Sequence, residues 1–142
     1  MDNIERDDLL LALENESNAS IMKLNSRKIQ KYKNDILQKV IKDRSKLKEF
    51  HKKLKYYRYC GELCDLQDGH YIRWIPLKDP NNIKLTIGGF FVDTEFSNGY
   101  LQIICKNGRR KIKAKFDEIL IFQKITNQEG VILSVLDYLD KS

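Results

Sequence analysis

The sequence predicts an α+β protein with two parts, a helical arm over residues 1–58 and a small antiparallel β-barrel over residues 59–142. Three observations lead to this prediction. Residues 21–58 contain neither glycine nor proline, and their apolar residues recur with helical spacing. After Tyr59 the apolar residues alternate with polar ones, which is the period of a strand. The chain ends on a second helical pattern, which we expect to close one end of the barrel.

The arm is expected to hold two helices. Residues 3–14 form the shorter one, with Asp2 as its N-cap, and the polar residues 15–20 separate it from the longer one. The longer helix, over residues 21–58, would span roughly 50 Å at 1.5 Å per residue. A helix of that length cannot bury its whole surface on so small a domain. It therefore either projects from the domain or pairs with another helix.

An imperfect heptad seam runs along the longer helix and favours a coiled coil. Ser26, Lys33 and Asp43 interrupt the seam because they fall on core positions. The alternative is an amphipathic helix that packs on its own domain. The residues that we assign to oligomerisation are Ile29, Ile36, Val40, Leu47, Phe50 and Leu54.

Five short strands are expected in the C-terminal part. Gly88-Gly89 marks a bulge or sharp bend in the second strand, and Thr126 with Glu129 forms a capping box that begins the closing helix. Short strands around a bent, glycine-broken one favour a five-stranded SH3-like barrel, and a flat sheet with a helix on one face is the alternative. The strands are expected at residues 71–77, 83–96, 100–106, 109–116 and 119–123.

The stretch YLQIICKNGRRKIKAKF, residues 100–116, predicts a regular hairpin. Asn107-Gly108 suits a two-residue type I′ turn, which would place Tyr100 opposite Lys115. Strict alternation then gives one apolar face and one face of lysines with an aromatic ring at its end. Such a face suits phosphate contact and base stacking, although lysine on exposed strands also guards against edge-to-edge aggregation.

Charge is spread unevenly along the chain. The formal net charge of +6 hides an acidic start, residues 1–22, with six acids and one arginine. Residues 23–58 carry fourteen lysines and arginines against three acids, and residues 59–142 are balanced. The basic middle segment predicts an anionic partner, which could be nucleic acid, an acidic protein or the acidic start itself. A solvated helix face is the alternative.

The leading hypothesis is therefore a nucleic-acid-associated protein that contacts phosphate without sequence preference. No zinc-finger, basic-zipper or RNP signature accompanies the charge, so binding would be salt-dependent. The alternative is a structural protein that assembles through the long helix, as a homo-oligomer or with another helical protein. The residues that we assign to nucleic-acid contact are Lys28, Lys31, Lys39, Lys42, Lys46, Lys53, Tyr100, Arg109, Lys111, Lys113 and Lys115.

Other kinds of site find little support in the sequence. Cys60, Cys64 and His70 lie close together, but their spacing differs from that of a zinc site, so we expect free thiols, no metal and no cofactor. Without nucleophile, P-loop, metalloprotease or dinucleotide motifs, we expect no enzyme. A weaker hypothesis is a peptide-binding adaptor, which requires an exposed Tyr71 or Trp74. The odd cysteine count and the lack of a long apolar stretch favour an intracellular setting and no membrane span.

Residues 68–142 resemble proteins of a known group. The stretch DGHYIRWIPLKDPNNIKLTIGGFFVD, followed by ILIFQK and a closing helix, is similar to short proteins of nucleocytoplasmic large DNA viruses. The resemblance implies a viral protein, packaged in the virion or acting in the host cytoplasm, and it assigns no functional residue. The expected barrel itself resembles SH3, Tudor and KOW modules, a likeness of fold that implies no activity.

Overall fold

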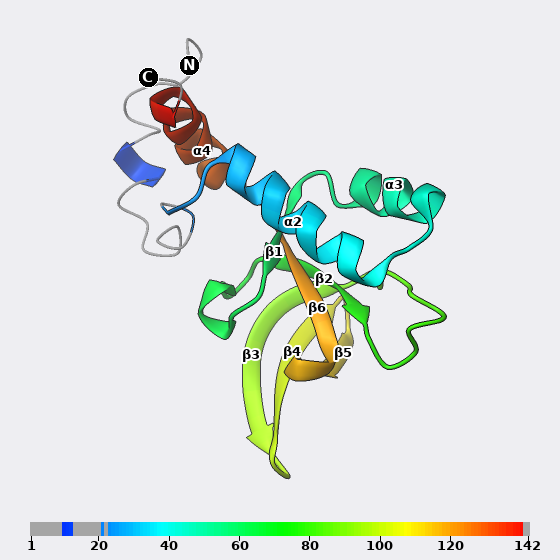
Figure 1. Ribbon diagram of the computed structural model, residues 1–142. Coiled ribbons are helices and arrows are strands. Elements are labelled where there is room, and N and C mark those ends of the chain that lie inside the picture. Colours follow the sequence, from blue (N-terminus) through cyan, green and yellow to red (C-terminus); the bar gives the residue numbers. More distant parts are fainter. Residues whose placement is uncertain (1–9, 13–20, 22, 141–142) are drawn as a thin grey trace.

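The computed structural model describes residues 10–12, 21 and 23–140 (Figure 1). Residues 10–12 are helical, whereas the rest of the helix expected at 3–14, its Asp2 cap and the polar stretch 15–20 lie outside the described residues. The helices are α2 (Ser26–Val40), α3 (Arg44–Lys53) and α4 (Asn127–Asp140), with short 3-10 turns at η2 (Leu63–Asp65) and η3 (Phe116–Glu118). The strands are β1 (Tyr57–Cys60), β2 (Tyr71–Pro76), β3 (Gly89–Ser97), β4 (Tyr100–Asn107), β5 (Arg110–Lys115) and β6 (Ile119–Lys124).

The six strands form one antiparallel sheet in the order β1-β6-β2-β3-β4-β5. β2 and β3 share only two residue pairs, Tyr71 with Phe90 and Ile72 with Gly89, so the sheet bends there into two three-stranded halves. Gly88 adopts a φ of 78°, and a Cβ on it would lie 1.9 Å from the carbonyl oxygen of Ile72. Position 88 therefore requires glycine. The strand predicted over 83–96 is wrong at its start, because residues 83–88 are not in a strand and the glycine pair lies where β3 begins; the register irregularity of β3 lies between Phe91 and Asp93.

The predicted five-stranded SH3-like barrel is wrong, because the sheet has six strands and stays open. The additional strand is β1, whose first residues were predicted to belong to the long helix. β1 pairs with β6, and α2 packs against it, so a helix rather than β5 covers this edge of the sheet. α4 does not close a barrel either, because Ile132 and Leu133 pack in one cluster with Ile29 at the start of α2. Figure 1 shows α4 beside that end of α2.

The predicted single helix over residues 21–58 is also wrong, because the chain leaves the helical conformation at Ile41 and starts α3 at Arg44. Ile41 is extended, with φ −113° and ψ 115°, and its side chain is buried. Asp43 is the N-cap of α3, where its carboxylate accepts a hydrogen bond from the Ser45 amide (3.1 Å). The acid that interrupts the heptad seam is thus a helix-start signal. The described helices are too short for the predicted coiled coil.

Lys33 is another interruption of the seam, and it is only 2% exposed. Its ammonium donates hydrogen bonds to the carbonyl oxygens of Leu54 (2.9 Å) and Tyr57 (3.0 Å). Burial lowers the pKa of Lys33. The lysine therefore joins α2 to the end of α3 and to the first residue of β1, and it adds a hydrogen bond to a carbonyl at the helix end that also accepts from the Tyr57 amide (3.0 Å).

Hydrophobic clusters on both sides of the β1-β6-β2 half hold the fold together. The cluster under the helices contains Leu37, Ile41, Phe50, Leu54, Ile75, Ile83, Leu120 and Phe122. The cluster inside the bent sheet contains Cys60, Leu66, Ile72, Trp74, Phe91, Ile103, Cys105 and Ile121. Because Phe50 of α3 packs its ring into the first cluster, the opposite side of α3 faces solvent.

Candidate nucleic-acid interface

The hairpin of β4 and β5 differs from the predicted one in its register. Asn107 pairs with Arg110. Compared with the prediction, the two turn residues are shifted by one position towards the C-terminus, and the pairing of the strands is shifted by two residues. The side-chain amide of Asn107 donates a hydrogen bond to the Gly88 carbonyl oxygen (2.9 Å), which holds Asn107 in the strand. Gly108, with φ of 63°, takes the first turn position, as suits a type II′ rather than a type I′ turn. A register shift of two keeps the β5 lysines on one face.

Three of the predicted hairpin residues already contact protein groups. Lys115 Nζ lies 3.8 Å from the centroid of the Tyr100 ring and 3.9 Å from a carboxylate oxygen of Glu118. Lys113 Nζ lies 2.8 Å from a carboxylate oxygen of Glu95 on β3, and this hydrogen bond lowers the pKa of Glu95. A base that stacks on that side of Tyr100 would first have to displace Lys115.

The turn end of the same hairpin has unpaired cations. Lys111 directly faces Lys106 across the two strands, and like charges in that position repel each other. Arg109 and Arg110 are exposed beside them. Within the described part of the chain, none of these four side chains forms an ion pair. We refer to the four as the turn cluster, and it includes the predicted residues Arg109 and Lys111.

Two of the predicted helical lysines are paired with acids one helical turn away. Lys31 Nζ lies 2.8 Å from a carboxylate oxygen of Asp35, and Lys53 Nζ lies 2.8 Å from one of Glu49. Such pairs at i, i+4 support the helix. They also reduce the charge that these lysines offer to an external anion.

The other four predicted helical lysines are dispersed. Lys42 Nζ lies 3.5 Å from a backbone carbonyl oxygen of α2, and Lys46 Nζ lies 6.0 Å from the centroid of the Phe50 ring. Lys28 and Lys39 are exposed but lie about three turns apart on α2. The structure therefore does not bring the six predicted helical lysines together as one surface.

A row of cations that the predicted site did not include lies on the solvent side of α3. Arg44, Lys48 and Lys52 follow one another at i, i+4, so they share one face of the helix, which we call the α3 stripe. All three are exposed, and the described structure pairs none of them with an acid. Phe50 lies on the opposite side and is 3% exposed. The spacing itself is present in the sequence, and the burial of Phe50 is what shows that this side of α3 faces solvent.

The α3 stripe and the turn cluster belong to different parts of the molecule. α3 packs through Phe50 on the β1-β6-β2 half of the sheet. The turn cluster lies on β4 and β5 in the other half, where β5 is the outermost strand. Figure 1 shows α3 at the upper right, on the side of the sheet where β1, β2 and β6 lie. The predicted interface is therefore two surfaces rather than one.

The residues assigned to oligomerisation are used inside the monomer. Ile29, Phe50 and Leu54 are buried. The half-buried residues that pack against the cluster under the helices include Ile36, Val40 and Leu47. These residues of α2 and α3 and of the turn that ends α3 are thus occupied by packing within the monomer.

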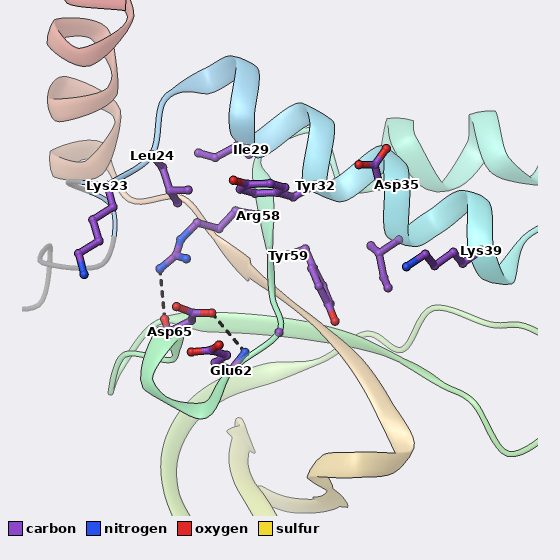
Figure 2. Close-up of a pocket in the computed structure, with 12 residues that line it drawn as sticks. Lys23, Leu24, Ile29, Tyr32, Asp35, Lys39, Arg58, Tyr59, Glu62 and Asp65 are labelled. Carbon is purple, nitrogen blue, oxygen red and sulfur yellow. Dashed lines mark hydrogen bonds between the residues drawn. The ribbon is translucent and has the colours of Figure 1, made fainter.

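A pocket of about 460 Å³ lies between α2 and the segment from β1 to η2 (Figure 2). Tyr32 from α2 and Tyr59 from β1 contribute aromatic walls. Arg58 donates a hydrogen bond to the Asp65 carbonyl oxygen (3.1 Å), and the Glu62 amide donates to the Asp65 carboxylate (3.2 Å). The charges that line the pocket balance, with Lys23, Lys39 and Arg58 against Asp35, Glu62 and Asp65. The pocket therefore does not select an anion.

The aromatic residues proposed for a peptide-binding adaptor are not freely exposed. Trp74 is buried in the cluster inside the sheet. Tyr71 is half-buried, and its hydroxyl donates a hydrogen bond to the Ile87 carbonyl oxygen. Neither ring offers the open aromatic face that this hypothesis requires.

The three cysteines are free, and two of them are buried. Burial raises the pKa of Cys60 and that of Cys105 to about 12, so both are neutral thiols at physiological pH. Among the residues that the structure describes, no three histidine, cysteine or acidic side chains come together as a metal site would require.

No protein-family model, curated protein or solved structure matches the chain. In the described part of the chain, no helix combines the length and the apolar character needed to cross a membrane. The chemistry of the two basic surfaces is therefore the basis for a functional proposal.

Proposed function

We propose that this protein binds the phosphate backbone of nucleic acid through the α3 stripe, without preference for base sequence. The observation that carries the proposal is the spacing of Arg44, Lys48 and Lys52, three exposed cations one helical turn apart that the described structure pairs with no acid. Contacts of this kind recognise the charge of the phosphates and not the identity of the bases. The proposed function is binding alone, with no chemical step.

The energetics of α3 support an anionic partner. Like charges at this spacing destabilise a helix by about 0.2–0.5 kcal/mol per pair. Arg44 adds to the repulsion because it is the first residue of α3, where the helix dipole disfavours a cation. α3 is held in place despite this, because Phe50 is buried and Lys33 binds the carbonyl of Leu54. A polyanion along the stripe would relieve the repulsion.

The turn cluster supports a second, weaker contact. Lys106 and Lys111 face each other, and Arg109 and Arg110 are exposed beside them. Its residues lie in one tight turn, so the cluster can meet only a short length of backbone. We therefore assign the main share of binding to α3.

The test is fluorescence anisotropy with labelled DNA and RNA of about 20 nucleotides, titrated between about 50 and 200 mM salt. We expect the logarithm of the binding constant to fall linearly with the logarithm of the salt concentration. Two oligonucleotides of unrelated sequence should bind equally. The triple variant R44Q/K48Q/K52Q should reduce the salt slope by about one unit for each phosphate that the protein no longer neutralises.

A charge-matched control separates the stripe from net charge. The variant K78Q/K84Q/K113Q also removes three positive charges, and it takes them from exposed or ion-paired lysines outside α3. It should lose much less affinity and less salt slope than R44Q/K48Q/K52Q. Equal losses in the two triple variants would mean that only net charge matters, and absence of binding at low salt would reject the proposal.

The same proposal places the protein with nucleic acid inside a cell or a virus particle. The free thiols of Cys60 and Cys105 support a reducing setting. Purification from the native source with and without nuclease treatment tests this part. Nucleic acid that copurifies and is lost on nuclease treatment is the expected result.

A further inference from the structure

A hollow of about 400 Å³ opens directly after α3, where the loop to β1 passes the start of α4. The loop contributes Lys55 and Tyr56, which follow Lys52 of the α3 stripe closely in the chain. Figure 1 shows this loop leading from α3 to β1, whose partner strand β6 leads into α4. The α4 side of the hollow includes Asn127, Gly130 and Ser134.

Tyr56 presents an exposed ring on a fixed backbone. Its side chain is 64% exposed. Its carbonyl oxygen accepts a hydrogen bond from the Ile125 amide (2.8 Å), and the amide of Tyr57 donates to the Leu54 carbonyl oxygen (3.0 Å). The ammonium of Lys55 also lies over the ring, but at 5.4 Å from its centroid it is farther away than Lys115 is from Tyr100 (3.8 Å) and leaves room for a base to stack. An exposed ring beside a cation is the combination that stacks a base and contacts its phosphate.

Gly130 keeps the α4 side of the hollow open. It lies inside α4, where glycine is less favourable than alanine. A Cβ on Gly130 would meet no atom within 4 Å, so packing does not require glycine at this position. The Ser134 hydroxyl donates a hydrogen bond to the Gly130 carbonyl oxygen (3.0 Å), and Asn127 is exposed nearby. The Asn127 amide can both donate to and accept from a base edge.

We propose that this hollow holds an unpaired nucleobase stacked on Tyr56, so that the partner is single-stranded nucleic acid. The inference rests on the proposed backbone contact along the α3 stripe, which would lead the strand to Lys55 and the hollow. A base paired within a duplex is stacked between its neighbours and cannot enter such a site. Stacking accepts any base, so the site keeps the lack of sequence preference.

The experiment compares anisotropy titrations of a labelled single strand with those of the duplex of the same sequence, for DNA and for RNA. The wild type should bind the single strand more tightly. Tyr56→Ala should weaken binding to the single strand by about tenfold, since it removes the ring on which a base stacks. It should leave duplex binding within about twofold, because the duplex contacts only the stripe.

Three further variants make the result specific. Tyr56→Trp should retain binding to the single strand, because it keeps a stacking ring. Gly130→Leu should fill the hollow and reproduce the loss, with a thermal unfolding midpoint that shows the fold intact. Tyr100→Ala, at the aromatic residue predicted from the sequence, should bind like the wild type, because Lys115 already covers that ring.

The outcomes separate this inference from the proposed function. Equal loss of single-strand and duplex binding in Tyr56→Ala, or no loss in both Tyr56→Ala and folded Gly130→Leu, would overturn the base-binding hollow and leave the backbone contact standing. A wild-type protein that binds neither polymer would overturn both. Loss caused by Tyr100→Ala would move the stacking site to the hairpin.

Discussion

Helix α3 and the β4–β5 hairpin are both rich in lysine and arginine, but they differ in the partners that their neighbours offer to these cations. In the hairpin, the neighbouring strand β3 supplies Glu95 to Lys113, and β4 supplies the Tyr100 ring to Lys115. On α3, Glu49 pairs with Lys53 and leaves the stripe without an acid. A strand within a sheet has neighbours on its solvent face, whereas the solvent side of a surface helix has only its own sequence to supply partners.

The largest effect should come from removing the side chain that anchors α3. Phe50→Ala takes a ring that is 3% exposed out of the cluster between the helices and the sheet. We expect the free energy of unfolding to fall by about 3–5 kcal/mol, the usual range for this change in a core. Urea unfolding measures it. Tyr56→Ala, on a 64% exposed ring, is the control and should stay within about 0.5 kcal/mol.

That result would also sharpen the comparison between the two regions. If Phe50 holds α3 in its folded position, Phe50→Ala should weaken nucleic-acid binding through the stripe even though it removes no charge. A variant that has lost helical circular dichroism signal but binds normally would show that α3 is not the binding element.

Buried Cys105 of the hairpin and buried Lys33 beneath α3 should change stability with opposite sign at alkaline pH. Cys105 on β4 has a pKa raised to about 12 by burial, whereas an unfolded thiol ionises near 9.0. The unfolded state therefore loses this proton first, and stability falls between pH 9 and 12 by about 1.4 kcal/mol per pH unit. Lys33 under α3 has a pKa lowered from 10.5 by burial, so its contribution to stability rises as pH approaches 10.5.

Two variants isolate these contributions. As pH rises above 9, the wild type should lose stability relative to Cys105→Ala. Over the same range, the wild type should gain stability relative to Lys33→Met. Urea unfolding at several pH values between 7 and about 10.5 gives both differences. A difference that stays constant with pH in either pair would contradict the role of burial at that residue.

The smallest effect should come from freeing a paired lysine of the hairpin, so that it has no acidic partner, like the cations of the α3 stripe. Glu95→Gln releases Lys113 from an exposed ion pair, so stability should change by about 1 kcal/mol or less. Nucleic-acid affinity should rise by about twofold to threefold, because one more cation and one fewer acid face the solvent. Anisotropy titration measures the change. Glu49→Gln, which frees Lys53 on α3, is the matched variant; a decrease in affinity in either variant would contradict this account.

Some features followed from local sequence alone. The capping box of α4 is present, since the Glu129 carboxylate accepts from the Thr126 amide (2.9 Å) and the Thr126 hydroxyl oxygen accepts from the Glu129 amide (3.1 Å). The two faces of the hairpin are also as expected, and Gly88 adopts a positive φ that suits glycine. Each depends on residues a few positions apart, so their spacing in the sequence determines the outcome.

The candidate site was only partly predictable. The basic character of residues 23–58 and the exposed Arg109 and Lys111 were readable from composition and alternation. The α3 stripe could not be singled out, because only the folded structure buries Phe50 on the opposite side and pairs Lys31 and Lys53 with acids. The pairing of Lys115 with Tyr100 and of Lys113 with Glu95 depended on a register that the sequence did not reveal.

The sequence by itself determined the turn and cap signals, the alternation of the hairpin and the basic middle segment, because these depend on neighbours along the chain. Tertiary structure alone decided the burial of Ile41, the use of Lys33 as a buried link, the register set by Asn107 and Gly88, and the addition of β1. Each of these joins groups distant in sequence. Their free energy exists only when the chain is folded, so no local pattern records them.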